Sequence, residues 1–244
     1  MPASPSVAQV TYLVLAKAPV PGAVKTRLTP AYSPHEAAAL AAAALLDTLD
    51  VVRRTAQLAD GHARRPVVAL TGDLAQAAAP DAVRAALADF TVLAQRGDGL
   101  GQRLAYAHVD AAGPDGATVQ IGMDTPQVLG DALAHAAGRV LEPGGPDAVL
   151  GPAEDGGWWL LALRRASDAG VVADVPMSTP DTGRLTRTAL ERAGLRVELA
   201  GDLRDVDEPG DVAVVAGAAP GSRFAELAGI FGRRPSASDR VAAG

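Results

Sequence analysis

Two carboxylate motifs in this sequence carry residue types that could hold a metal ion. Asp124 closes the apolar stretch "ATVQIGMD", and Asp205 and Asp207 lie in "DVDEPGD". Carboxylates from two separated strand ends can converge on one Mg²⁺, which prefers a few carboxylates together with phosphate oxygens and water. Each motif also has an ordinary explanation: Asp124 as a helix N-cap, and the later pair as turn chemistry around Pro209 and Gly210. The combination of the motifs, more than either one, predicts a metal site.

A basic loop near the start of the chain could face a phosphate. In "LAKAPVPGAVKTRLTP", Lys17, Lys25 and Arg27 follow an apolar run and flank a turn that contains Pro and Gly. Backbone amides of such a turn, together with cations, suit an anion of several charges such as a di- or triphosphate. The loop matches neither the Walker pattern nor GxGxxG. Taken alone, it is equally consistent with a solvated surface loop.

Short β-like runs alternate with longer helical patterns, and this alternation predicts the frame that holds both features. Strands are expected at residues 10–16, 65–72, 90–95, 117–124, 147–153, 158–164 and 195–200. Helices are expected at 33–57, 79–89, 126–141 and 181–193, and residues 96–112 are expected to form a Gly-rich turn that enters a helix. Ser33 can cap the first helix, with Pro34 at its first position. The pattern predicts an α/β fold with a mostly parallel sheet and helices on both faces. Ligands bind outside the carboxyl ends of such strands, where the basic loop and Asp124 are expected.

Composition limits the classes of protein that fit. The chain has 244 residues, is 48% hydrophobic, contains no cysteine and carries a net charge of −6. These values favour a globular protein without disulfides or thiolate sites, and they disfavour a nucleic-acid surface. No apolar run approaches the roughly 20 residues that span a bilayer, and no secretory signal is evident, so a cytoplasmic protein without membrane contact is expected. We expect a disordered segment at residues 1–9, one domain at 10–232 and a mobile tail at 233–244.

Six segments together resemble a known family. "KAPVPGAVKTRL", "GDGLGQRL", "IGMDTPQV", "VLGPAEDGGWWLLAL", "MSTPDT" and "DVDEPGDV" occur in the order typical of an uncharacterised bacterial family with the glycosyltransferase-A fold. That family is similar to molybdenum-cofactor guanylyltransferases and to 2-phospholactate guanylyltransferase. The resemblance spans about residues 11–215. It implies a Rossmann-like nucleotide-diphospho-sugar transferase fold, a nucleotide donor, a small-molecule acceptor and Mg²⁺ or Mn²⁺.

The resemblance also implies roles for individual residues. It assigns Lys25 and Arg27 to the donor phosphates, with Asp124 and Asp207 as metal ligands and Asp205 as a supporting or substitute ligand. The wider nucleotide-binding set that it implies is Ala16, Lys17, Gly22, Lys25, Arg27, Gln95, Gly99, Leu100, Gly101 and Arg103. The implied acceptor set is Glu154, Asp155, Gly156, Gly157 and Trp158. Because neighbouring strand residues face opposite ways, we expect at most one of Trp158 and Trp159 to line the pocket.

Three functions remain open. The first is nucleotidyl transfer from a nucleoside triphosphate to a small phosphorylated or hydroxylated acceptor, with release of pyrophosphate. The second is glycosyl transfer from a nucleotide-diphospho-sugar, a reaction that usually relies on a local Asp-x-Asp pair where this sequence offers only Asp124 in "MDTP". The third is a nucleotide-binding domain without catalysis. The single aspartate favours nucleotidyl transfer. The sequence predicts neither the nucleobase, the acceptor nor the oligomeric state.

Overall fold

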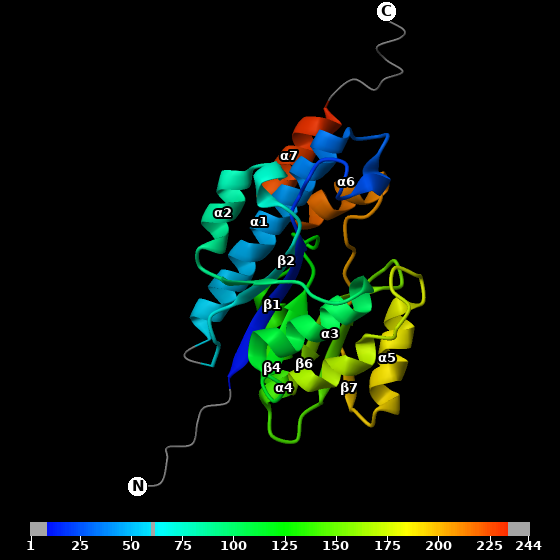
Figure 1. The fold of residues 1–244 in the computed structure, drawn as a ribbon. Coiled ribbons are helices and arrows are strands. Elements are labelled where there is room, and N and C mark those ends of the chain that lie inside the picture. The colour runs from blue at the N-terminus through cyan, green and yellow to red at the C-terminus, as the bar shows by residue number, and fades with distance from the viewer. Residues whose placement is uncertain (1–8, 60–61, 234–244) are drawn as a thin grey trace, which may run out of the picture.

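A seven-stranded sheet forms the centre of the computed structural model, which describes residues 9–59 and 62–233 (Figure 1). The strand order is β3, β2, β1, β4, β6, β5, β7, and β6 alone runs antiparallel to its neighbours within the described sheet. The strands are β1 (Val10–Lys17), β2 (Val67–Thr71), β3 (Thr91–Ala94), β4 (Ala117–Ile121), β5 (Ala148–Pro152), β6 (Trp158–Leu163) and β7 (Val197–Leu199). The expected mostly parallel sheet is confirmed. The segments expected to be disordered, 1–9 and 233–244, lie outside the described residues except at their inner ends.

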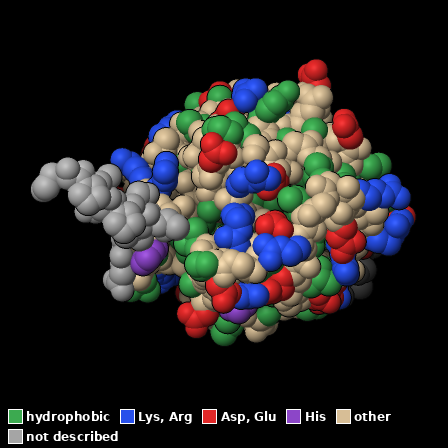
Figure 2. Space-filling model, turned by 90° about the horizontal axis from the view of Figure 1, so that it is seen from below, with side chains coloured by type: hydrophobic (Ala, Val, Ile, Leu, Met, Phe, Trp, Pro, Cys, Tyr) green, Lys and Arg blue, Asp and Glu red, His purple; other side chains and the backbone are tan. Residues whose placement is uncertain are grey.

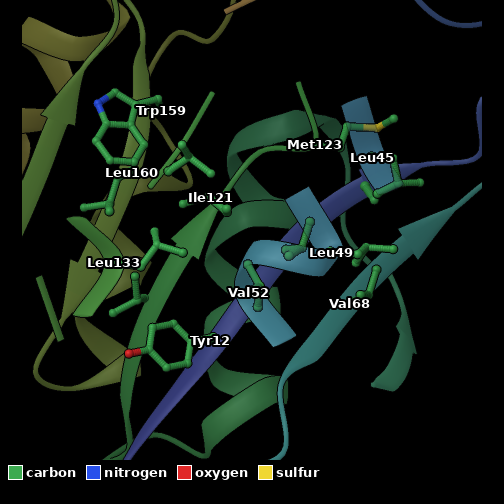
Figure 3. Packing of buried hydrophobic residues seen from close by; sticks show 14 of the residues in the cluster. Tyr12, Leu45, Leu49, Val52, Val68, Ile121, Met123, Leu133, Trp159 and Leu160 are labelled. Carbon is green, nitrogen blue, oxygen red and sulfur yellow. The ribbon is translucent and has the colours of Figure 1, made fainter. Parts of the chain in front are cut away.

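Helices cover both faces of the sheet (Figure 1). The α-helices are α1 (Pro34–Leu58), α2 (Pro80–Leu87), α3 (Gly99–Ala112), α4 (Gly130–Leu141), α5 (Thr182–Arg192), α6 (Pro209–Ala218) and α7 (Arg223–Gly232). Short 3-10 turns are η1 (Thr26–Leu28), η2 (Leu74–Gln76) and η3 (Ala166–Val172). On one face, Leu45 and Leu49 of α1 and Leu133 of α4 pack against Ile121 and Leu160 of the sheet (Figure 3). On the other face, α3 and η3 form a second core.

The start of α1 follows the local signals in the sequence. Ser33 Oγ accepts a hydrogen bond from Glu36 N, and Glu36 Oε2 accepts one from Ser33 N at 2.9 Å. These two bonds form a capping box that satisfies amides left unpaired at a helix start. Pro34 occupies the first turn, so the predicted helix start is confirmed.

Three features differ from the sequence-based expectation. Strand β4 ends at Ile121, and the helix expected from residue 126 begins at Gly130, because the intervening chain makes a turn in which Val128 N donates to Thr125 O. Asp124 is therefore not the N-cap of α4, whose cap position is Leu129. Helices α6 and α7 were not predicted.

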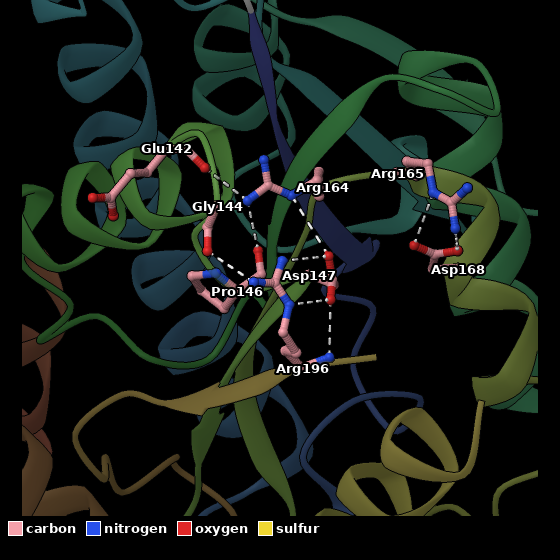
Figure 4. A network of polar contacts seen from close by, with 8 residues as sticks. All are labelled: Glu142, Gly144, Pro146, Asp147, Arg164, Arg165, Asp168 and Arg196. Atoms are coloured by element: carbon pink, nitrogen blue, oxygen red, sulfur yellow. Dashed lines mark hydrogen bonds and ion pairs between the residues drawn. The ribbon is translucent and has the colours of Figure 1, made fainter. Parts of the chain in front are cut away.

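Ion pairs join the segments that precede β5 and β7 at the amino ends of these strands. Asp147, just before β5, accepts hydrogen bonds from Arg196, just before β7, and lies 3.7 Å from Arg164 Nε (Figure 4). The hydrogen bonds from Arg196 are the main cause that lowers the pKa of Asp147 to about 2. Figure 2 shows basic and acidic side chains interspersed on the face seen from below. No helix of the described chain is both long and apolar enough to span a membrane.

Candidate functional site

A cavity of about 360 Å³ lies where β1 and β4 end. The two strands are parallel neighbours, so the residues that follow them meet at one edge of the sheet. The charged residues of the lining are Lys17, Arg103, Asp124, Asp155 and Asp205. The sheet thus gathers the basic loop, the end of β4 and the carboxylate-rich segment around one cavity.

Backbone hydrogen bonds bring Asp205 to Asp124, although 81 positions separate them in the chain numbering (205 − 124). After β7, Leu203 N donates to Pro152 O at 3.2 Å, and Val206 N donates to Asp124 O at 3.3 Å. These bonds lay the segment that carries Asp205 across the carboxyl ends of β5 and β4. Asp205 therefore lines the same cavity as Asp124.

The pKa of Asp205 is shifted by these surroundings. Burial raises its pKa to about 6, and the charges of Asp124 and Asp155 add to the rise. The charge of Lys25 acts in the opposite direction and lowers the pKa. Burial and the neighbouring carboxylates thus oppose ionisation of Asp205, and a divalent cation beside it would favour its charged form.

Lys25 is the cation closest to Asp124. Its Nζ lies 2.6 Å from Asp124 Oδ2, and the two side chains are 13% and 29% exposed. Burial alone would lower the pKa of Lys25, but the charge and hydrogen bond of Asp124 outweigh it, so the pKa is raised. Lys25 adopts a left-handed conformation with φ 47°, which directs the chain into η1. The ammonium thus stays charged and holds the end of β4.

Arg27 and Asp207 form a second ion pair beside the cavity, outside its lining. The Arg27 side chain is 61% exposed, and the hydrogen bond to Asp207 is the main cause that raises its pKa. Directly after Arg27, Leu28 is fully buried and anchors η1 to the core. The loop is therefore anchored in the fold, while the guanidinium of Arg27 reaches solvent.

The rest of the expected nucleotide-binding set divides into lining and supporting residues. Ala16, Lys17, Gln95, Leu100 and Arg103 contribute to the lining. Gln95 Nε2 donates to Ala16 O at 2.8 Å and to Ala69 O at 2.9 Å, which fixes the orientation of its carboxamide. Lys17 Nζ donates to Ala23 O at 2.7 Å, so it currently supports the loop.

Three glycines of that set lie outside the lining. Gly22 and Gly99 have φ values of 76° and 79°, which suit glycine in turns. A Cβ at Gly101 would lie 2.6 Å from Ala173 O, so Gly101 allows α3 to pack closely on η3. The structure thus gives each of these glycines a role in shaping the backbone.

The turn between β5 and β6 forms another wall of the cavity. Asp155, Gly157 and Trp158 line it, whereas Glu154 lies outside the lining and its Oε2 accepts a hydrogen bond from Arg204 Nε at 2.9 Å. Gly156 is also outside the lining, and a Cβ there would collide with a backbone carbonyl at 1.9 Å.

Both tryptophans contribute to the lining, so the expectation that at most one of them does so is wrong. β6 begins at Trp158, opposite an irregularity in β5. The cavity therefore reaches around the first residues of the strand. The indole of Trp159 is held by a hydrogen bond from Nε1 to Gly201 O at 2.9 Å.

Asp124 and Asp205 are the two lining carboxylates that could hold a divalent ion. Within residues 9–59 and 62–233, no group of three or more His, Asp or Glu side chains is arranged to hold a metal. A two-carboxylate site would leave positions for phosphate oxygens and water, as Mg²⁺ prefers.

Several lining residues were not identified from the sequence. They include Thr71, Gln120, Thr125, Met177 and Thr179. Gln120 did carry a signal, because it is the amide within the otherwise apolar stretch "VQIGM". Met177 and Thr179 lie in "MSTPDT", a segment that was noted for the resemblance but given no role.

The sequence matches one family profile. The family described as "Uncharacterized protein conserved in bacteria (DUF2064)" matches residues 31–179, which is more than half of the chain. The chain belongs to this family. No curated protein matches its sequence.

Solved structures support the glycosyltransferase-A type of fold. A protein from Desulfovibrio desulfuricans G20, provisionally named a nucleotide-diphospho-sugar transferase, is 26% identical with a TM-score of 0.74, covering 92% of this chain and 98% of that one. A 4-diphosphocytidyl-2C-methyl-D-erythritol synthase is 14% identical with a TM-score of 0.56, covering 87% and 99%. A CMP:2-keto-3-deoxy-manno-octonic acid synthetase complexed with CTP is 12% identical with a TM-score of 0.53, covering 85% and 97%. The predicted nucleotide-diphospho-sugar transferase fold is confirmed.

Proposed function

We propose that this DUF2064 protein is a nucleotide-using transferase that moves a nucleotidyl group from a nucleoside triphosphate to a small acceptor. The observation that carries the proposal is the meeting of Lys25 and Arg27 with Asp124, Asp205 and Asp207 at one edge of the sheet. Cations suit the phosphates, and carboxylates suit a divalent ion that accompanies them. The Desulfovibrio relative, provisionally named a nucleotide-diphospho-sugar transferase, supports the use of a nucleotide donor.

The ion pairs of the free protein suggest how a donor would be accommodated. Lys25 and Arg27 are paired with Asp124 and Asp207. A triphosphate could take over the two cations while its divalent ion takes over the carboxylates. Each charged group would then keep a partner of opposite sign, which limits the cost of breaking the pairs. Arg27 can grip phosphate oxygens through two parallel hydrogen bonds, and Lys25 acts as a point charge.

Mg²⁺ or Mn²⁺, when bound, would neutralise phosphate charge and orient the donor. Asp124 is the proposed ligand from β4. The resemblance assigns Asp207 as the second ligand and Asp205 as its support. The lining favours the reverse order, because Asp205 shares the cavity with Asp124 whereas Asp207 faces Arg27.

The proposed reaction is a displacement at phosphorus. An acceptor oxygen attacks the α-phosphorus, the bond from that phosphorus to the bridging oxygen breaks, and pyrophosphate leaves with the electron pair. Negative charge grows on the leaving group, where Lys25 and Arg27 would stabilise it. Removing either cation should therefore slow the transfer step. Binding of a nucleoside monophosphate, which lacks the leaving group, should be weakened less.

Glycosyl transfer is the second candidate, favoured by the provisional name of the Desulfovibrio relative. In that reaction the acceptor attacks a sugar carbon and a nucleoside diphosphate leaves. In the turn after β4, Asp124 has no aspartate two positions before or after it, because those positions hold Gly122 and Pro126. This arrangement favours nucleotidyl transfer.

Thermal denaturation in the presence of ligands tests the proposal. GTP, CTP, UTP, ATP and UDP-glucose would each be added with and without Mg²⁺. At about 100 times Kd a bound ligand contributes about 2.7 kcal/mol, which raises the Tm of a chain of this size by roughly 5–10 °C. We expect at least one triphosphate to give a magnesium-dependent shift that Asp124→Asn abolishes. No shift with any nucleotide would contradict the proposal, and a shift with UDP-glucose alone would favour glycosyl transfer.

A further inference from the structure

One buried side-chain oxygen of the cavity lining lacks a hydrogen-bond partner within the described part of the chain. Gln120, on β4, is 1% exposed and lines the cavity. Its Oε1 has no hydrogen-bond partner among the described residues. Leaving a buried carbonyl oxygen unpaired costs stability, so the fold alone does not explain a glutamine there.

Gly122 and Asp124, which follow the end of β4, line the cavity together with Gln120. A Cβ at Gly122 would lie 2.8 Å from Asp124 Oδ1, so the glycine lets the carboxylate lie close to the backbone there. The Asp124 carboxylate and the Gln120 amide therefore contribute to the same cavity.

A second lining residue shares this feature. Thr125 is 1% exposed, lines the cavity and has no partner for its Oγ1 among the described residues. Thr118, two residues before Gln120 on β4, differs, because its Oγ1 lies 2.7 Å from His108 Nδ1. The lining thus holds two unpaired polar oxygens with which a bound ligand could form hydrogen bonds.

The surroundings indicate which group would bind. Leu15, Leu104 and Met177 supply apolar parts of the lining, while Asp124, Asp155 and Asp205 supply negative charge. The lining cations are directed elsewhere: Lys17 Nζ donates to Ala23 O, and Arg103 Nε points to Gly97 O at 3.5 Å. Lys25 is paired with Asp124, and in the proposed complex the donor phosphates take over this cation and the divalent ion. A second anion beside Asp155 would then meet a carboxylate without a facing cation, whereas a hydroxyl or amide would not be repelled.

We propose that Gln120 is a specificity-determining residue that binds a hydroxyl or amide of an uncharged or cationic acceptor. This inference rests on the proposed function and narrows its acceptor class to molecules without a phosphate or carboxylate. A carboxamide donates and accepts hydrogen bonds, and so does a hydroxyl, so the two groups match. In the transfer, an acceptor hydroxyl oxygen bonds to the α-phosphorus, pyrophosphate leaves with the electron pair, and the hydroxyl proton passes to a cavity carboxylate and then to water.

Fractionated small molecules test the acceptor class. A deproteinised bacterial extract would be separated on an anion exchanger into a flow-through and a retained anionic fraction. Each fraction would be incubated with the enzyme, Mg²⁺ and each nucleoside triphosphate, and pyrophosphate would be measured against the Asp124→Asn variant. We expect release with the flow-through. Release with the retained fraction, or equally with both, would overturn the inference while leaving the proposed function intact. Release with neither would contradict the proposed function and the inference with it.

Gln120→Met tests the residue itself, because methionine keeps the length of the side chain and removes the amide. The amount of flow-through needed for the half-maximal rate should rise about 5-fold or more, because one hydrogen bond to the acceptor is lost. The half-saturating triphosphate concentration should change less than about 2-fold, and the urea midpoint should not fall, because an unpaired buried oxygen is removed.

Thr118→Val provides the matched control. It should lower the urea midpoint, because the His108 ring loses its partner, and leave the dependence on acceptor unchanged. An unchanged acceptor dependence in Gln120→Met, an equal rise for the triphosphate, or a fall in its urea midpoint like that of Thr118→Val would each overturn the role of Gln120.

Discussion

Replacing Lys25 with methionine removes the cation beside Asp124 and keeps an unbranched side chain. Exposed ion pairs contribute about 0.2–1 kcal/mol, and removing one partner of a buried pair costs about 3–5 kcal/mol. The Lys25 and Asp124 side chains are 13% and 29% exposed. This pair lies between the two limits, so we expect Lys25→Met to lower the free energy of unfolding by about 2 kcal/mol. For a chain of this length that corresponds to a fall in Tm of roughly 4–8 °C.

The response to magnesium distinguishes loss of the Lys25–Asp124 ion pair from a packing defect. Lys25→Met leaves Asp124 beside Asp205, whose pKa is already raised by burial and by neighbouring carboxylates. A divalent ion can replace the lost ammonium between these groups. We therefore expect millimolar Mg²⁺ to raise the Tm of the variant more than that of the wild type.

Thermal denaturation at neutral pH, in EDTA and in MgCl₂, measures both effects. Arg187→Met is the matched control, because Arg187 pairs with Glu191 at 2.7 Å on the surface, where the side chains are 47% and 45% exposed. That variant should lose less than about 1 kcal/mol and show no response to magnesium. A loss in Lys25→Met no larger than in the control, or an equal magnesium effect in wild type and variant, would refute the reasoning.

Three further predictions concern charged residues. Arg27→Ala should weaken triphosphate binding about 10-fold or more, since it removes a charge-assisted contact, and hardly change monophosphate binding; calorimetry at one salt concentration checks this, and equal losses for both would contradict it. Asp205→Asn should reduce magnesium-dependent turnover more than Asp207→Asn, and the reverse order in a rate assay would restore Asp207 as the ligand. The pKa of Asp147 is lowered from 3.8 to about 2, so its charge stabilises the fold above about pH 4 and this contribution is lost as the pH falls toward 2. Asp147→Asn should therefore cost about 1 kcal/mol at neutral pH, and urea midpoints of wild type and variant should converge in acid; a constant difference would contradict this.

Local signals were sufficient where the interactions themselves are local. The start of α1 could be predicted because Ser33, Pro34 and Glu36 lie within one turn and satisfy one another. Helix α6 could not, because "DVAVVAG" reads like a buried strand. Its start is stabilised by Asp211 Oδ2, which accepts from Glu208 N at 2.7 Å. Val212 and Val215 are buried against α1 and α7, whereas Val214 is exposed. Tertiary packing decided between two secondary structures that the sequence allowed.

In the candidate site, too, some features could be predicted from the sequence and others depend on contacts between distant segments. The order of strands and motifs predicted that Asp124 and the "DVDEPGD" segment would meet at one edge of the sheet. Which aspartate of that segment faces the cavity depends on the hydrogen bond from Val206 N to Asp124 O, which joins distant parts of the chain. The pairing of Glu154 with Arg204, 50 positions apart, likewise has no sequence signal. Such contacts require the fold to be known.

Phosphorus-31 NMR of a complete reaction mixture tests the central claim most directly. The mixture would contain the protein, Mg²⁺, the triphosphate that gives the largest thermal shift, and the extract fraction that supports turnover. The account predicts a growing pyrophosphate signal and a new phosphodiester signal from the nucleotidyl group, both absent with Asp124→Asn. A nucleoside diphosphate formed from a nucleotide sugar, without any pyrophosphate from a triphosphate, would contradict it.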